Sequence, residues 1–216
     1  MPSMQVTPRA VRGLAARHAI ETLRAADPVL GAVIERAGPC RIEGRRDAFI
    51  ALAEAIVHQQ LSMKAAATIW KRFEGLFTGG RVVPDVLKRL SSQRLRGVGL
   101  SRQKIRYLKS LATSFEDGTL GGRELRRLGD EEVIESLTRL PGIGRWTAEM
   151  FLIFCLKRPD VWPVDDLGLL KGLKRLFRLR RLPKREKALA LGERWKPYRT
   201  VATWYLWRGL DEGGIG

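Results

Sequence analysis

The chain has 216 residues, 44% of them hydrophobic, a composition that provides a buried core and excludes a largely disordered protein. Forty Lys and Arg residues against 23 Asp and Glu give a formal net charge of +17, which indicates a polyanionic partner. No apolar run is long enough to cross a bilayer or to serve as a signal peptide. We therefore expect no membrane association and a cytoplasmic, nucleoid-associated protein, or a nuclear one in a eukaryote.

Helical periodicity extends over most of the chain, and strand signals are nearly absent. The expected helices cover approximately residues 11–25, 28–37, 48–58, 62–77, 84–90, 93–97, 102–117, 131–140, 145–157, 166–177, 184–191 and 197–209. Their expected N-terminal caps include Asp47, Ser92, Ser101 and Asp130. Because no low-complexity linker divides the chain, we expect one compact all-α unit over 1–216. It would comprise two helical lobes with a cleft between them, one from about 50–156 and the other from about 1–49 with 157–216.

Side chains that commonly bind metals are few and scattered. Cys40 and Cys155 are too few for a four-cysteine iron–sulfur cluster or a zinc ribbon, and Cys155 lies in the apolar run FLIFCL. His18 and His58 are far apart in the sequence. We expect no metal site built from side chains and no cofactor, the one candidate being a monovalent cation held by main-chain carbonyls of the hairpin described below.

Basic residues gather in two segments. Residues 88–109 contain eight Lys or Arg and no acid, and residues 171–199 contain twelve against two Glu. Such clustering favours a binding surface for a polyanion, whereas a basic but inert surface is the alternative.

The sequence LPGIGRWTA at 140–148 has the form of two helices joined by a glycine-rich hairpin. Gly142 and Gly144 allow a tight turn and a close approach of the main chain to a ligand. The N–H groups at the start of the second helix suit a phosphate oxygen, and such a contact positions DNA without reading its sequence. The predicted phosphate-binding residues are Gly142, Ile143, Gly144, Arg145 and Thr147. An ordinary turn between helices is the alternative.

A second segment, residues 95–104, has a related outline, with Gly97, Gly99 and a basic helix that Ser101 would cap. It is either a further phosphate contact or a structural connection between helices.

Residues 45–210 resemble the helix-hairpin-helix DNA glycosylase superfamily, and within it the DNA-3-methyladenine glycosylase II family. Four blocks in the order of that family carry the resemblance: AIVHQQLSMKAAA at 55–67, LPGIGRWTAEMFLIF at 140–154, WPVDDLGLLKG at 162–172 and WKPYRTVATWYLW at 195–207. The resemblance implies two helical lobes with a damaged base flipped into the cleft between them. We expect the compact form, without the N-terminal β-rich domain of some members.

Two adjacent acids, Asp165 and Asp166, precede the expected helix 166–177. Either could be an ordinary helix cap. The resemblance implies a catalytic Asp after the hairpin at about this spacing, and the residues that follow, Leu169 and Lys171, fit the family better for Asp166. Asp165 would then be a cap or a supporting carboxylate. A carboxylate is needed because cleavage of an N-glycosidic bond builds positive charge on the deoxyribose.

The resemblance also implies how a flipped base is held. Trp146, Trp207 and Trp204 correspond to, or neighbour, aromatic pocket positions, although core packing is the commoner fate of Trp. Gln59 and Gln60 would approach the lesion, and Gln60 or Leu61 would fill the gap left in the duplex. A plain polar helix end is the alternative for this segment.

Relatives that also cut the strand have a Lys in the hairpin where this chain has Trp146, so we expect base release without strand cleavage. The predicted protein is a monofunctional glycosylase for alkylated purines of the 3-methyladenine and 7-methylguanine type. It would act on damaged double-stranded DNA as a monomer without an obligate protein partner. The alternatives are a glycosylase for deaminated or oxidised purines and a non-catalytic DNA-binding protein.

Overall fold

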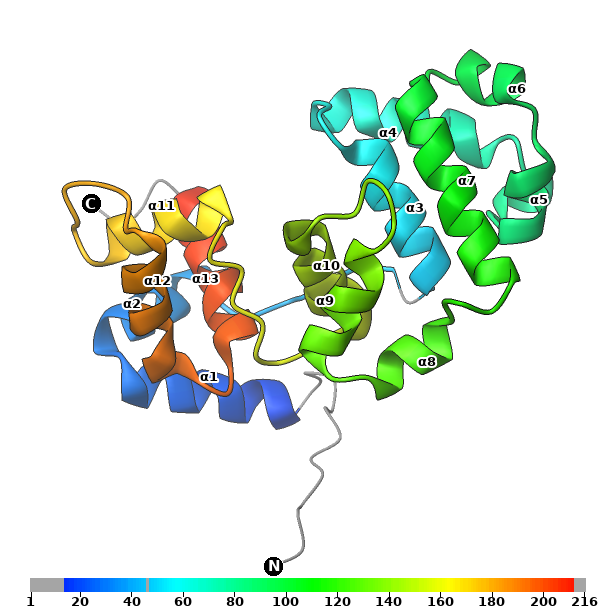
Figure 1. Cartoon of the computed structure of the whole chain (residues 1–216). Helices are drawn as coiled ribbons and strands as arrows, with labels where there is room; N and C mark the ends of the chain where they lie inside the picture. Colours follow the sequence, from blue (N-terminus) through cyan, green and yellow to red (C-terminus); the bar gives the residue numbers. More distant parts are fainter. Residues whose placement is uncertain (1–13, 46, 212–216) are drawn as a thin grey trace, which may run out of the picture. The chain divides into compact units, whose positions relative to one another are not determined.

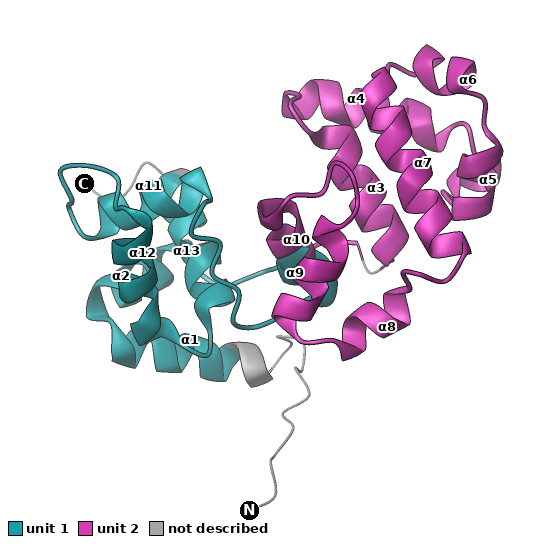
Figure 2. Ribbon diagram, in the orientation of Figure 1, with its two compact units in different colours: residues 1–43, 152–216 teal, residues 44–151 magenta. Residues whose placement is uncertain are grey.

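The computed structural model describes residues 14–45 and 47–211, and within these ranges it contains helices and loops but no strand (Figure 1). The chain divides into two compact units, which we call unit 1 (residues 1–43 and 152–216) and unit 2 (residues 44–151) (Figure 2). The sequence placed the boundaries between its two lobes near residues 50 and 156. None of the described helices is long and apolar enough to span a membrane.

Unit 1 is formed by the two ends of the chain. Its helices are α1 (Leu14–Ala26), α2 (Pro28–Ala37), a π-helical turn (Leu152–Leu156), α11 (Leu167–Leu176), α12 (Arg185–Gly192), a 3-10 turn (Glu193–Trp195) and α13 (Arg199–Asp211). Helix α13 packs against α11, α2 and α1. Its Tyr205 is fully buried in this core, as is Trp195, and the Tyr205 hydroxyl donates to the Gly38 carbonyl over 2.9 Å. The C-terminal helix therefore joins N-terminal and C-terminal segments into one core.

Unit 2 is a continuous segment of the chain. It contains α3 (Ala48–His58), α4 (Met63–Glu74), a 3-10 turn (Thr78–Gly80), α5 (Pro84–Arg89), α6 (Ser92–Gly97), α7 (Arg102–Glu116), α8 (Gly122–Arg127), α9 (Asp130–Thr138) and α10 (Arg145–Phe151). Helix α7 packs against α3, α5 and α6, and α3 also packs against α4 and α10. Fully buried Leu52, Ile56, Phe73 and Leu108 belong to these helices. Helices α3 and α7 thus form the centre of unit 2, against which α4, α5, α6 and α10 pack.

Most expected helices are present with small shifts at their ends. Two of the expected caps are confirmed: the Asp47 carboxylate accepts from the Ile50 N–H over 3.0 Å, and the Ser101 hydroxyl accepts from the Lys104 N–H over 3.2 Å. Of the expected helix 11–25, residues 11–13 lie outside the described ranges, and the helix ends at Ala26. The expected helix 145–157 changes to π-helical hydrogen bonding after Phe151.

Three expectations are corrected. Ser91, not Ser92, caps α6, because its hydroxyl reaches the Arg94 N–H over 3.2 Å while Ser92 is already helical. Asp130 lies inside α9, where the preceding Gly129 donates its N–H to the Glu132 carboxylate over 2.7 Å. Helix α8 was not expected, since its six residues follow Gly121 and begin at Gly122, and glycine disfavours a helix.

Candidate active site and nucleic-acid interface

The glycine-rich hairpin of unit 2 connects α9 to α10 through a tight turn. The Ile143 N–H donates to the Leu140 carbonyl over 3.2 Å, and Gly142 has a φ of +88°, in the region that favours glycine. A Cβ at Gly142 would also overlap the ring of Tyr107 on α7. A Cβ at Gly144 would instead meet no atom within 4 Å. Gly142 is therefore required by the fold, whereas Gly144 leaves an open approach to the start of α10.

Three of the predicted phosphate-binding residues have side chains that are already engaged in the hairpin. The Arg145 guanidinium donates to both carboxylate oxygens of Glu131 on α9, over 3.0 and 2.6 Å, and to Glu149 over 3.2 Å. This hydrogen bonding lowers the pKa of Glu131 against the opposing effect of desolvation. The side chains of Ile143 and Thr147 are buried. A phosphate at this turn would thus be held mainly by the main chain at the start of α10, where a helix lacks intrahelical partners for its first N–H groups.

Trp146 occupies the first turn of α10, next to this turn. Its side chain is 47% exposed, which is uncommon for the most bulky of the apolar residues. The exposed indole offers a stacking face at the DNA-facing end predicted for the hairpin. Its place in a lesion pocket stays a prediction.

The loop that follows α3, residues 59–62, contacts the hairpin directly. The Gln59 side-chain amide donates to the Gly142 carbonyl over 2.7 Å. Gln60 has a φ of +55°, a conformation that costs energy for residues other than glycine and is often found at functional sites. Leu61 is 38% exposed, and Ser62 caps α4. The loop thus holds Gln59 against the hairpin, while the role of Gln60 or Leu61 in filling the duplex stays a prediction.

Met63, the first residue of α4, is 82% exposed and is not among the predicted site residues. An exposed, flexible apolar side chain two residues after Leu61 is a further candidate for contact with unstacked bases. The signal in the sequence is an apolar Met directly after Ser62, the residue that caps α4.

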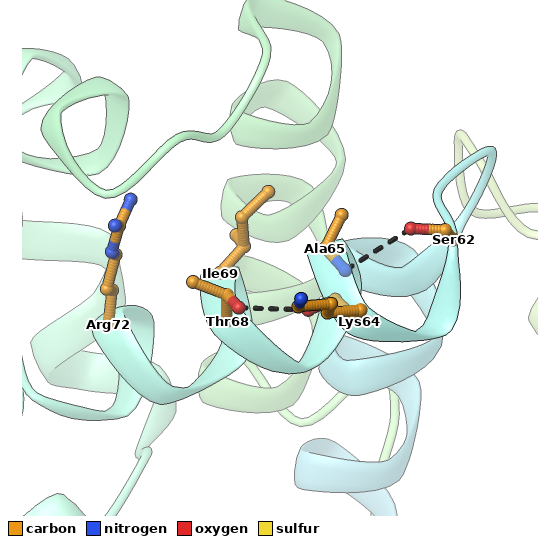
Figure 3. Close-up of a pocket in the computed structure, with 6 residues that line it drawn as sticks. All are labelled: Ser62, Lys64, Ala65, Thr68, Ile69 and Arg72. Atoms are coloured by element: carbon orange, nitrogen blue, oxygen red, sulfur yellow. Dashed lines mark hydrogen bonds between the residues drawn. The ribbon is translucent and has the colours of Figure 1, made fainter.

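An open hollow of about 430 Å³ lies along α4, beginning at the same loop (Figure 3). It is lined by Ser62, Lys64, Ala65, Thr68, Ile69 and Arg72. A Cβ at Gly99 would lie 3.2 Å from Cγ1 of Ile69, so the hollow lies close to the second glycine turn, residues 97–99. The lining has two cationic side chains but no aromatic ring or carboxylate. It therefore suits a phosphate better than a damaged base, and the phosphate role expected for residues 95–104 stays a prediction.

The carboxylate of Asp166 lies in unit 1, at the start of α11. Its Oδ1 accepts from the Leu169 N–H over 2.7 Å, which makes Asp166 the helix cap, and from the indole Nε1–H of Trp207 over 2.8 Å. The cap alone would explain the first bond. The second bond comes from a different helix, α13, and is not needed to cap α11. Together the two bonds fix the direction of a half-buried carboxylate.

Trp207 is itself held from the other side. Its ring stacks on Phe154, with centroids 5.9 Å apart and planes 15° from parallel. A Cβ at Gly168 would lie 2.9 Å from Cδ1 of Trp207 and 3.0 Å from Oδ1 of Asp166. Glycine at position 168 therefore leaves the space in which the indole and the carboxylate meet.

Asp165 has a different environment from its neighbour. Both of its carboxylate oxygens accept from Nη1 of Arg185 over 2.7 Å, at an exposed position. Of the two alternatives for Asp165, the helix cap is wrong, because Asp166 fills that position, and the supporting carboxylate stays a prediction. A supporting role for Asp165 would act through its ion pair with Arg185.

Trp204 is packed mainly inside unit 1, against the core of that unit and edge-on to Tyr205 at 5.0 Å. The Arg208 guanidinium lies 5.8 Å from its ring centroid. These contacts favour the core interpretation of Trp204 over a pocket role.

Part of the second basic segment, residues 177–184, forms the loop between α11 and α12. A hollow of about 650 Å³ is lined there by Leu179, Arg180, Arg181, Leu182, Pro183, Lys184, Glu186 and Lys187. Four of these side chains are cationic and exposed, so this loop is a candidate contact for a DNA backbone on unit 1.

Known proteins resemble this chain in sequence and in fold. The model of the HhH-GPD superfamily base excision DNA repair proteins matches residues 53–197. DNA-3-methyladenine glycosylase 1 of Schizosaccharomyces pombe is 40% identical over 172 residues, which are 79% of this chain and 75% of that protein. The chain belongs to the HhH-GPD superfamily.

Two solved structures have the same fold as this HhH-GPD chain. The 3-methyladenine DNA glycosylase (Mag1) of S. pombe in complex with abasic DNA aligns with a TM-score of 0.82 and 35% identity, covering 92% of this chain and 98% of that one. A DNA-3-methyladenine glycosidase from Bacillus halodurans aligns with a TM-score of 0.83 and 37% identity, covering 96% and 95%. The chain spans 58% to 75% of the length of three curated relatives that it matches.

These findings confirm the predicted family, the all-α helix-hairpin-helix fold and the prediction of a DNA glycosylase in base excision repair. Among the described residues, no group of three or more His, Cys, Asp or Glu could hold a metal ion. The monovalent cation at the hairpin carbonyls and the individual site residues stay predictions.

Proposed function

We propose that this HhH-GPD chain hydrolyses the N-glycosidic bond of alkylated purines in double-stranded DNA and leaves the strand intact. The observation that carries the proposal is the carboxylate of Asp166, fixed by the Leu169 N–H and the Trp207 indole. The names of its relatives support the substrate class, because the S. pombe protein and the B. halodurans protein are both named for 3-methyladenine.

The proposed chemistry needs one well-oriented carboxylate. Departure of the base leaves positive charge on the deoxyribose, and the negative Asp166 side chain stabilises that charge and orients the attacking water. Glycoside hydrolases meet a similar transition state with carboxylates. Alkylated purines that already carry a positive charge are good leaving groups, so no general acid is required.

Aromatic side chains would hold the base. An electron-poor or cationic purine stacks favourably on indole, the most electron-rich of the protein rings. Trp146 is exposed at the hairpin, and Trp207 is half-buried beside Asp166. Each is proposed as a stacking surface, and Trp207 has the second role of orienting the carboxylate.

DNA would be held by its phosphates. The main chain at Gly144 and the start of α10 would bind one phosphate, and the basic segments 88–109 and 171–199 would add contacts that release counterions. We further propose that the protein acts as a monomer, without an obligate partner, in the compartment that holds the DNA.

The test is an assay of the purified protein on duplexes that each contain one lesion: 3-methyladenine, 7-methylguanine, hypoxanthine, etheno-adenine or 8-oxoguanine. Free base is measured by chromatography, and strand breaks are measured before and after alkali. We expect release of the alkylated purines, with breaks only after alkali. Release restricted to hypoxanthine or 8-oxoguanine would identify a glycosylase for deaminated or oxidised purines. Binding without release of any base would identify a non-catalytic DNA-binding protein.

A further inference from the structure

Lys104 on α7 is half-buried, and its ammonium lies against the end of α3. Its ammonium donates to the carbonyls of Val57 and Gln59, each over 2.7 Å. The last carbonyls of a helix have no intrahelical partner, and a cation there is favoured by the helix dipole. Burial lowers the pKa of Lys104, as expected for a cation that has exchanged water for carbonyl partners. This lysine therefore fixes the main chain at the point where α3 ends and the loop 59–62 begins.

The side chain of Gln59 binds the same loop to the hairpin. Gln59 accepts from Lys104 through its carbonyl and donates through its amide to the Gly142 carbonyl over 2.7 Å. The connection therefore runs from α7 through Gln59 to the turn of the hairpin. It joins three parts of unit 2 that are widely separated in the sequence.

Helix α7 makes a second contact with the hairpin, one turn after Lys104. The ring of Tyr107 lies so close to Gly142 that no Cβ would fit between them, and the Gln103 amide donates to the Tyr107 hydroxyl. Residues three apart lie on one face of a helix. One face of α7 therefore contacts both the loop, through Lys104, and the hairpin, through Tyr107. The φ of +55° at Gln60 shows that the loop is held in a conformation it would not readily adopt alone.

We propose that Lys104 is a positioning residue for base release, which holds the loop 59–62 in a fixed relation to the hairpin. This inference rests on the proposed function, in which the hairpin binds a phosphate, and on the predicted role of Gln60 or Leu61 in filling the gap left by the flipped base. The gap and the nearby phosphate are a fixed distance apart in DNA. A connection that keeps loop and hairpin at a matching distance lets both contacts form at once, and this favours the flipped state.

The proposal distinguishes Lys104 from a lysine that binds phosphate. Because its ammonium is used inside the protein, its loss should leave the affinity for undamaged duplex and the slope of that affinity against salt concentration unchanged. A lysine that contacts phosphate would reduce the slope by about one.

The experiment compares Lys104→Met and Lys104→Arg with Lys71→Met, which removes the same charge from an exposed position on α4. Hydrogen exchange is followed in peptides covering 59–62 and 139–144, together with single-turnover base release and binding to undamaged duplex. In Lys104→Met we expect faster exchange in both segments and release slowed about tenfold, the scale of a lost charge-assisted hydrogen bond. Lys104→Arg, which keeps a cationic donor, should recover most of the rate, and Lys71→Met should match the wild type in exchange and release.

The exchange measurement does not depend on activity, so the two proposals can fail separately. An inactive wild type would refute the proposed function, while the exchange pattern would still test the connection. Lys104→Met with wild-type exchange and release would overturn the positioning role, as would a reduced salt slope. Exchange that rises throughout the chain would show a role in folding alone and would also overturn it.

Discussion

The indole N–H of Trp207 donates to the same oxygen of Asp166 that accepts the Leu169 N–H, at 2.8 and 2.7 Å. The carboxylate is thereby fixed by its own helix and by α13. A carboxylate that accepts only the capping N–H can still rotate about that hydrogen bond. The second donor, from α13, restricts this rotation of the Asp166 carboxylate. This arrangement makes the effects of substitution at and around Asp166 specific enough to test.

Asp166→Asn should slow base release by about 100-fold or more, because the amide lacks the charge that stabilises the developing cation. Asn is as good a helix cap as Asp, and its oxygen can accept the same two bonds, so the thermal midpoint and the affinity for lesion DNA should change little. Single-turnover release and equilibrium binding measure the two effects.

The matched control for this prediction is Asp165→Asn, which breaks an exposed ion pair with Arg185. Exposed ion pairs contribute little to stability, so the rate of base release by Asp165→Asn should stay within about threefold of the wild-type rate. The reverse order, with Asp165→Asn the more damaging change, would move the catalytic role to Asp165.

Trp207→Phe should lower the release rate about tenfold, because it removes the N–H donor to Asp166 while a ring remains to stack on Phe154. Gly168→Ala should act in the same direction, since its methyl group would enter the space between indole and carboxylate. Trp204→Phe, which removes no bond to Asp166, should slow release less. Equal losses for Trp204→Phe and Trp207→Phe would show that ring size, not the hydrogen bond, matters.

The two glycines of the hairpin should respond differently to alanine. Gly142→Ala combines a φ of +88° with a clash against Tyr107, so it should lower both the thermal midpoint and the affinity for DNA. Gly144→Ala should leave the thermal midpoint nearly unchanged but weaken binding to damaged and undamaged duplex alike, because its methyl group stands where a phosphate approaches. Thermal unfolding and binding titrations at several salt concentrations test this. Unchanged affinity in Gly144→Ala, or an affinity insensitive to salt, would argue against main-chain phosphate binding at this turn.

The pair Glu131–Arg145 should make stability depend on pH in the acid range. Hydrogen bonding from Arg145 holds the pKa of Glu131 below its ordinary value of 4.5, so the folded state favours the charged form. The stabilisation is fully present above 4.5 and is lost as pH falls through the lower pKa of the folded protein. Urea unfolding should show Glu131→Gln less stable than the wild type near neutral pH, by at most about 1 kcal/mol because the pair is exposed, with the difference vanishing in acid. Glu135→Gln on the same helix is the control for loss of a charge, and a difference independent of pH would contradict the assignment.

Borohydride should trap no covalent complex between the wild-type protein and lesion DNA. Trp146 has no amine where a Schiff base would form, and Lys104 of the same unit is bound to two carbonyls. The released product should be free base with an uncut strand. Efficient trapping mapped to any lysine would place the chain among enzymes that also cleave the strand.

The all-α fold and most helix positions could be predicted from the sequence, because caps and periodicity are local signals. The caps Asp47 and Ser101 illustrate this. The predicted cap Ser92 was wrong by one residue, because its neighbour Ser91 has the same side chain and caps α6. Asp166 and the hairpin were found from short motifs and a resemblance. The contacts that orient them were not found, because they join residues far apart in the sequence. Lys104 and Gln59 are 45 positions apart, and Trp207 and Asp166 are 41 apart.

The packing of α13 against α1 and α2 has a consequence for synthesis of the chain, which proceeds from the N-terminus. Leu23, Leu30 and Val33 on the first two helices lose their exposure only when residues after 152 are available to cover them. Unit 2 is continuous in sequence and can fold as soon as residue 151 has emerged. A ribosome-bound chain that ends before α13 therefore carries an uncovered apolar face on its first two helices, and such a face favours aggregation and chaperone binding.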